Sequence, residues 1–100
     1  MMRYKQPLSS YSYVSKPVVI EAISVAKLQE QRAADWEGTP MWVYRLKGTV
    51  WTYDGDGIIV RTLEGDMRGG PTDMLIRGTA GELYPCKLDI FNTKYEPCAY

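Results

Sequence analysis

The side chains of this chain that could do chemistry are its acids, arginines, aromatic rings and two cysteines, because the sequence contains no histidine. Histidine is the commonest general base and a very common neutral metal ligand, so its absence excludes histidine-dependent triads and dyads. The acids are densest at Asp54, Asp56, Glu64, Asp66 and Asp73. Folding could gather such carboxylates into a hydrolytic pair. Their spacing follows turns and not one face of a helix or strand, so we rank a carboxylate-dependent hydrolase as the third hypothesis.

The segment Asp-Gly-Asp-Gly at residues 54–57 resembles the start of a calcium loop. A calcium loop needs oxygen ligands at fixed spacing and a glutamate at its twelfth position. Counted from Asp54, the fifth position is Ile58 and the twelfth is Gly65, so the ligand set fails. Two consecutive Asp-Gly steps instead predict a hairpin turn. We expect no metal ion and no other cofactor.

The two cysteines, Cys86 and Cys98, lack the close spacing of zinc ligands. Lys87 follows Cys86 directly, and a nearby ammonium group can lower the pKa of a thiol. Without a histidine partner, however, nucleophilic catalysis has little support, and we expect Cys86 to behave as a small apolar residue. Both thiols are expected to be reduced. Enzymatic activity is not expected.

Arginine and aromatic side chains could instead form a ligand site, in which guanidinium groups meet phosphate and a ring stacks on a base. The candidates for phosphate contact and for stacking are Arg45, Arg61 and Arg77, and Trp42, Tyr44 and Trp51. The same rings favour strands and large cores or interfaces, which is the interpretation that we prefer. Residues 64–71 are rich in glycine but lack the lysine-serine or lysine-threonine step of a phosphate loop.

The aromatic content also suggests self-association. The chain has three tryptophans and eight tyrosines in 100 residues, and such rings are favoured at interfaces. Trp42, Tyr44, Trp51 and Tyr53 fall on two neighbouring predicted strands. We therefore predict a two-fold homodimer held by an aromatic patch.

The overall composition narrows the class of partner. The net charge is zero, which argues against a general nucleic-acid binder because such proteins carry a basic excess. No apolar run approaches the length needed to cross a bilayer, and the chain does not start with a signal-peptide core. We expect no membrane association and a cytoplasmic location.

The fold expected from these patterns is α+β: a mainly antiparallel sheet of five or six strands, one principal helix and a short C-terminal helical turn. Residues 17–100 are expected to form this single domain, after a basic, aromatic arm at 1–16. Strands are predicted at residues 18–25 (central in the sheet), 42–46, around 51–53, at 58–63, 74–77 and 82–86, and from 94. Glycines at both ends of 78–81 predict a hairpin between the strands at 74–77 and 82–86, and Pro85, which lacks an N–H, predicts that the second of them is an edge strand there or is ending. The principal helix is predicted over 25–36 with Ser24 as its N-cap, the helical turn over 88–92, and a loop over 64–71. The predicted core consists of Val18, Val19, Ile20, Leu28, Ile59, Leu75, Leu83, Ile90 and Phe91.

The most ordered pattern lies between Asp73 and Glu96, where an aspartate-led strand precedes G-E-L-Y-P-C-K, then D-I-F and Y-E. This pattern resembles the C-terminal signature of small proteins of tailed phages and prophages, and K-P-V-V-I-E-A at 16–22 resembles their opening. Related domains often carry a P-G-D-Y-G-like motif. Pro71 and Asp73 match it, whereas Thr72 stands in place of the first glycine and Met74 in place of the aromatic residue. The resemblance implies that the protein is encoded by a phage or prophage, and it implies no particular activity.

Three functions follow in order of preference. The first is a phage-encoded, non-enzymatic accessory protein that binds a host or phage protein in the host cytoplasm, with inhibition of host defence as one such role. The second is a small-ligand binder, with a nucleotide as the ligand. The third is the hydrolase described above.

Overall fold

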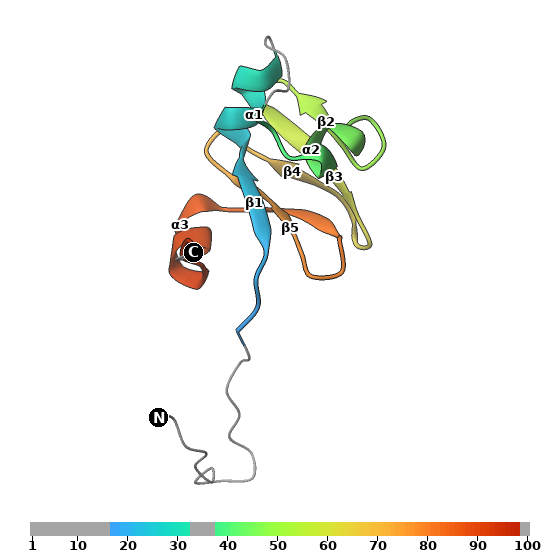
Figure 1. The fold of residues 1–100 in the computed structure, drawn as a ribbon. Helices are drawn as coiled ribbons and strands as arrows, with labels where there is room; N and C mark the ends of the chain where they lie inside the picture. The colour runs from blue at the N-terminus through green and yellow to red at the C-terminus, as the bar shows by residue number, and fades with distance from the viewer. Residues whose placement is uncertain (1–16, 33–37, 99–100) are drawn as a thin grey trace, which may run out of the picture.

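The computed structural model describes residues 17–32 and 38–98, so the predicted arm at 1–16 lies outside the described residues. The described residues form two three-stranded antiparallel sheets and three helices (Figure 1). This confirms the predicted α+β class. The six strands, however, divide between two sheets and do not form the single sheet that the sequence suggested.

The first sheet has the strand order β1-β5-β6 and consists of β1 (Glu21–Ser24), β5 (Met74–Arg77) and β6 (Leu83–Cys86). The second sheet has the order β2-β3-β4 and consists of β2 (Trp51–Asp54), β3 (Gly57–Thr62) and β4 (Gly65–Gly69). The helices are α1 (Val25–Arg32), α2 (Met41–Arg45) and α3 (Leu88–Lys94). Figure 1 shows α1 and α2 beside the second sheet and α3 at the far end of the first sheet.

At the junction of β1 and α1, the helix cap is the predicted one, but the strand does not have the predicted position in the sheet. The Lys27 N–H donates to the Ser24 side-chain oxygen at 3.0 Å, which confirms Ser24 as the helix N-cap. The predicted central strand over residues 18–25 is wrong, because β5 takes the centre and β1 is a short edge strand. Val18 and Val19 are 58% and 63% exposed. A continuous apolar run therefore did not identify the central strand.

The predicted strand over residues 42–46 is wrong, because this segment forms the helix α2. The Val43 N–H donates to the Pro40 carbonyl at 3.0 Å, which opens the first turn. The sequence fits both periods: Leu46 lies three residues after Val43 and four after Trp42, so these side chains share one helical face, which packs into the core. Alternation of aromatic residues alone could not separate the two structures.

The predicted loop over residues 64–71 is also wrong, because most of it forms β4. A two-residue turn joins β3 to β4, and Gly65 after it has φ 109°, a value that side-chain-bearing residues rarely adopt. At the other end of β4, a Cβ on Gly69 would lie 3.2 Å from both Ile58 and Pro85. The glycines thus serve a hairpin and a close approach of β4 to β6.

The hairpins predicted around residues 54–57 and 78–81 are both confirmed. Pro85 lies on β6, an edge strand of its sheet, as predicted from its missing N–H. The turn before β5 is closed by Asp73, whose carboxylate accepts a hydrogen bond from the Gly70 N–H at 2.8 Å. No described residue other than glycine has a positive φ, so Thr72 has a backbone conformation open to any residue.

The predicted helical turn at residues 88–92 is confirmed by α3, but the strand predicted from Lys94 is wrong. Residues 95–98 have no regular structure. Tyr95 instead packs on Phe91, with ring centroids 5.3 Å apart. Asp89 does not occupy the N-cap position of α3, which is Lys87, although its carboxylate accepts the Ile90 N–H at 2.8 Å.

The core lies where the two sheets meet under α1 and α2, and its buried residues are Val25, Leu28, Val43, Trp51, Ile58, Val60, Leu75 and Leu83. The prediction was right for Leu28, Leu75 and Leu83. It was wrong for Val18, Val19 and Ile90, which are exposed, while Ile20, Ile59 and Phe91 are half-buried. Among the described residues, no helix is long and apolar enough to cross a membrane.

Candidate binding groove between the two sheets

The aromatic residues predicted to stack on a ligand have separate roles. The ring of Trp51 is 1% exposed, and its indole N–H donates to the Val43 carbonyl at 2.7 Å. Trp51 also meets Tyr53 edge to face, with centroids 5.1 Å apart. Trp51 is therefore part of the core. Trp42 is half-buried against that core. Of the three predicted stacking rings, only that of Tyr44 is exposed, and it lies on α2.

The three predicted phosphate-binding arginines are also separated. Arg45 is exposed at the end of α2, and Arg77 forms an ion pair with Glu21 at 2.9 Å across the β1–β5 ladder. Arg61 lies on β3 and is the one among the three that lines a cavity. The structure thus does not bring the six predicted site residues together.

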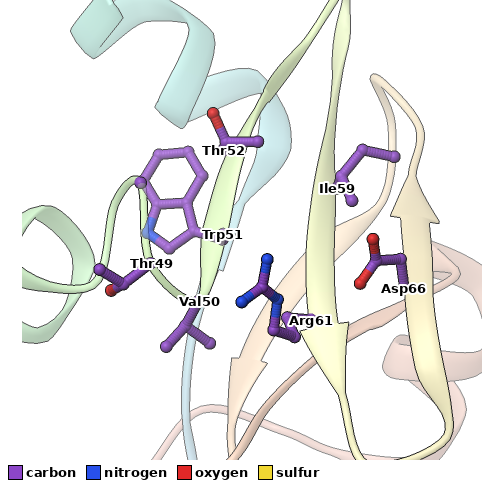
Figure 2. A pocket seen from close by; sticks show the side chains of 8 residues that line it. Thr49, Val50, Trp51, Thr52, Ile59, Arg61 and Asp66 are labelled. Carbon is purple, nitrogen blue, oxygen red and sulfur yellow. The ribbon is translucent and has the colours of Figure 1, made fainter.

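Arg61 lines a small polar hollow on the outer side of the second sheet. Figure 2 shows its guanidinium group beside Val50 of the segment that leads into β2, with Asp66 on the neighbouring strand β4. The hollow encloses about 100 Å³. Ligand sites commonly enclose about 300–1,000 Å³, so this hollow is small for a nucleotide.

The predicted acid cluster is organised by turns. Arg68 donates to the Asp54 carboxylate at 2.8 Å and to the Asp56 carboxylate at 2.9 Å. These two hydrogen bonds raise the pKa of Arg68 above its usual value. The carboxylates hold the β2–β3 turn against β4, and Asp73 closes its own turn. Within residues 17–32 and 38–98, no group of acids and cysteines is placed to hold a metal ion.

A second, larger cavity was missed by the sequence reasoning. It is a groove of about 690 Å³ between the β3–β4 hairpin and β6. Most of its lining is apolar, and its residues are Leu46, Val50, Arg61, Thr62, Leu63, Glu64, Met67, Gly81, Glu82, Leu83 and Tyr84. The volume falls within the usual range for ligand sites.

The outer rim of this groove carries exposed apolar side chains beside charges. Leu63 is fully exposed at the β3–β4 turn, and Met67 is exposed on β4. Glu64 follows Leu63 in the turn, and Arg61 precedes it on β3. Neither Arg61 nor Glu64 forms an ion pair with another described residue. The rim therefore offers one charge of each sign to a ligand.

Tyr84 forms part of the opposite wall. Burial raises the pKa of Tyr84 to about 12, and a hydrogen bond with the Tyr95 side chain, together with the negative charge of Glu82, acts in the same direction. The phenol is therefore neutral at physiological pH.

Two features of the sequence could have indicated the groove. Leu63 is a large apolar residue in a tight turn, and Met67 stands alone among polar and glycine residues. The second wall could not be inferred, because it depends on how β6 meets the other sheet.

Comparisons of the chain with models of protein families, with curated proteins and with solved structures found no match.

Proposed function

We propose that this chain is a non-enzymatic binding protein whose partner is another protein that places an apolar segment in the groove. The observation that carries the proposal is the fully exposed Leu63 at the mouth of a groove lined mainly by apolar residues. Exposed apolar side chains that adjoin a concave surface favour protein or ligand contact. The scattered acids and the arginines in separate places favour binding over catalysis.

The resemblance to proteins of tailed phages supports a partner from the host or from the phage. Inhibition of a host-defence protein is one function of this kind, exerted in the host cytoplasm. A partner of either origin needs only to supply apolar side chains and a complement to the rim charges.

The proposal is tested by tagged capture from a host lysate with matched variants. Leu63→Glu and Met67→Glu place a charge at the groove, and Ile90→Glu places the same charge on the exposed surface of α3. We expect a specific partner to be captured by the native chain and by Ile90→Glu but lost with both groove variants. Retention of the partner by both groove variants, with unchanged thermal stability, contradicts the proposed site.

A nucleotide ligand is the second candidate, because Arg61 lines both the polar hollow and the apolar groove. A ligand that binds the folded state raises its apparent melting temperature. We expect a panel of nucleotides to shift the native chain and not Arg61→Gln if this function is correct. No shift at millimolar ligand removes it.

The predicted homodimer also remains a proposal. The predicted interface patch included Trp51, which is buried in the core. The exposed residues on α2 that could form such an interface are Met41 and Tyr44. Light scattering across a dilution series should give a dimer mass that Met41→Glu lowers to that of a monomer. A monomer mass for the native chain at tens of micromolar removes the proposal.

A further inference from the structure

The chain that leads into β1 extends beyond its sheet. The β1–β5 ladder ends where Glu21 pairs with Arg77, and the chain after β5 turns back to form β6. Residues 17–20 have no ladder partner among the described residues, and Figure 1 shows them continuing the line of β1 beyond the sheet. Val18 and Val19 in this segment are 58% and 63% exposed. An apolar, β-branched run therefore projects from the fold.

The outer edge of β1 is open as well, because β1 is an edge strand of the first sheet. Residues of an antiparallel strand direct their backbone groups alternately to one neighbour and to the other. The Val25 N–H donates to the Asp73 carbonyl at 2.9 Å, so every second residue before Val25 directs its backbone groups toward β5. Ala22, and before it Ile20 and Val18, direct theirs outward, where no described backbone group bonds to them.

The two faces of β1 have different surroundings. Ile23 packs against the core, so its neighbour Ala22 lies on the opposite face of the sheet. Ala22 there lines a cavity of about 320 Å³, whose other side is formed by α3 and the residues after it. Val18 and Phe91 are among the apolar residues of its walls. An apolar side chain placed beside Ala22 on this face would enter the cavity.

Little on this edge opposes contact with a second copy of the chain. Natural edge strands usually carry lysine or another charge that prevents further pairing. Glu21 is the one charged residue from 17 to 24, and its carboxylate already pairs with Arg77 at 2.9 Å. Pro17 falls at a position whose backbone groups point to the β5 side, so its missing N–H removes no donor from the outer edge.

The edge is complementary to itself in one register. A two-fold axis at Ile20 pairs Ile20 of the two copies, and it pairs Val18 of each copy with Ala22 of the other. All three residues direct their backbone groups outward, so these groups satisfy one another. An axis at Glu21 would place two like charges directly opposite, which is unfavourable. An axis at Val19 would leave the outward groups of Ala22 without a described partner.

We propose that two copies of this chain join through β1, so that the first sheets of both form one six-stranded sheet. In this dimer β1 becomes a central strand, the position that its continuous apolar run predicts. Val18 of each copy enters the cavity beside Ala22 of the other, and the two Ile20 side chains form a β-branched cross-strand pair. The inference goes beyond the proposed function, because the groove lies along β6, at the opposite edge of this sheet.

The patch on α2 is the alternative place for a two-fold contact, and one variant decides between the two. Figure 1 shows α2 beside the second sheet, so Met41→Glu leaves the outer edge of β1 intact. A dimer joined through β1 keeps its mass with Met41→Glu, whereas a dimer joined through α2 loses it. Dissociation by Met41→Glu therefore overturns the β1 interface.

A pair of proline variants tests the ladder by sedimentation equilibrium. Ile20→Pro removes the outward N–H at the two-fold axis, and Val19→Pro removes an N–H of the other direction; neither residue belongs to the β1–β5 ladder. We expect the native chain to be a dimer at tens of micromolar. With Ile20→Pro the dissociation constant should rise roughly 30-fold, the effect of two hydrogen bonds, because each copy loses one. Val19→Pro should change it much less.

A cross-link specific to the register provides a second measurement if a proline variant fails to fold. Val19 of one copy and Glu21 of the other form a pair without hydrogen bonds, with Cα atoms about 4.5 Å apart, which suits a disulfide. The variants carry Cys98→Ser, because Cys98 is exposed. On oxidation, a mixture of Val19→Cys and Glu21→Cys chains should form the disulfide faster than either variant alone.

The outcomes separate this interface from the groove. A monomer mass for the native chain at tens of micromolar overturns the β1 dimer. An Ile20→Pro chain that folds and keeps the native dissociation constant overturns it too, as does a mixture of cysteine variants that cross-links no faster than each alone. Leu63→Glu should keep the dimer mass, so loss of a captured partner with Leu63→Glu reports on the groove only.

Discussion

Substitution of Tyr84 by phenylalanine should change how stability depends on pH. The pKa of Tyr84 is raised from 10.0 to about 12 by burial first and by its bond with Tyr95 second. The folded state therefore holds this proton more tightly than the unfolded chain. The stabilisation is complete below pH 10 and is lost as the pH rises from 10 to 12, because the unfolded chain releases the proton first.

The shift sets the size of the effect. One pKa unit corresponds to about 1.4 kcal/mol, so the full shift gives an upper limit of about 3 kcal/mol. Tyr84 is partly exposed, and solvent screening reduces this to about 1–2 kcal/mol. Tyr84→Phe should therefore flatten the fall in the free energy of unfolding above pH 10 by that amount.

Urea unfolding at a series of alkaline pH values measures this effect. Tyr95→Phe is the matched control, because it removes the smaller contribution of the Tyr95 hydroxyl to the pKa of Tyr84 but leaves the burial of Tyr84 in place. That control should keep most of the alkaline slope. Parallel pH profiles for the native chain and Tyr84→Phe would refute the assignment of the slope to Tyr84.

Three further changes test the packing, each by urea unfolding. Trp51→Phe should cost about 2–4 kcal/mol, because it removes buried ring volume and leaves the Val43 carbonyl without its donor. Gly69→Ala should cost about 1–3 kcal/mol, because the added Cβ would lie 3.2 Å from atoms of both sheets. Gly70→Ala is the control and should cost less, because its Cβ would meet its nearest atom at an ordinary 3.6 Å. Equal losses in stability would refute the close approach of the two sheets. Ser24→Ala should cost about 1 kcal/mol as the N-cap is lost, and a neutral result would remove that role.

The groove explains why the search for catalytic residues in the sequence led elsewhere. That search weighs histidines, acids and arginines, and several of the acids and arginines present here serve turns, such as Arg68 between Asp54 and Asp56. The groove is built from ordinary residues such as Leu63 and Leu83, whose chemistry is not distinctive. Of the six predicted site residues, Arg61 alone lines it.

The sequence by itself determined the features that depend on near neighbours. The two hairpin turns, the Ser24 cap and the short helix α3 were all predicted, because each is decided within a few residues by glycine conformation, proline or a capping side chain. The α+β class followed from the same signals.

Only the tertiary structure decided the features that depend on distant contacts. The pattern of residues 41–45 fits the period of a strand and also that of a helix. The segment forms a helix, in which Val43 contacts Trp51 of the core. The division of six strands into two sheets rests on where β6 lies relative to β4, and the contact of Gly69 with Pro85 is invisible from local pattern. The groove results from that division, because its walls come from strands that are distant in sequence and meet only when the chain has folded.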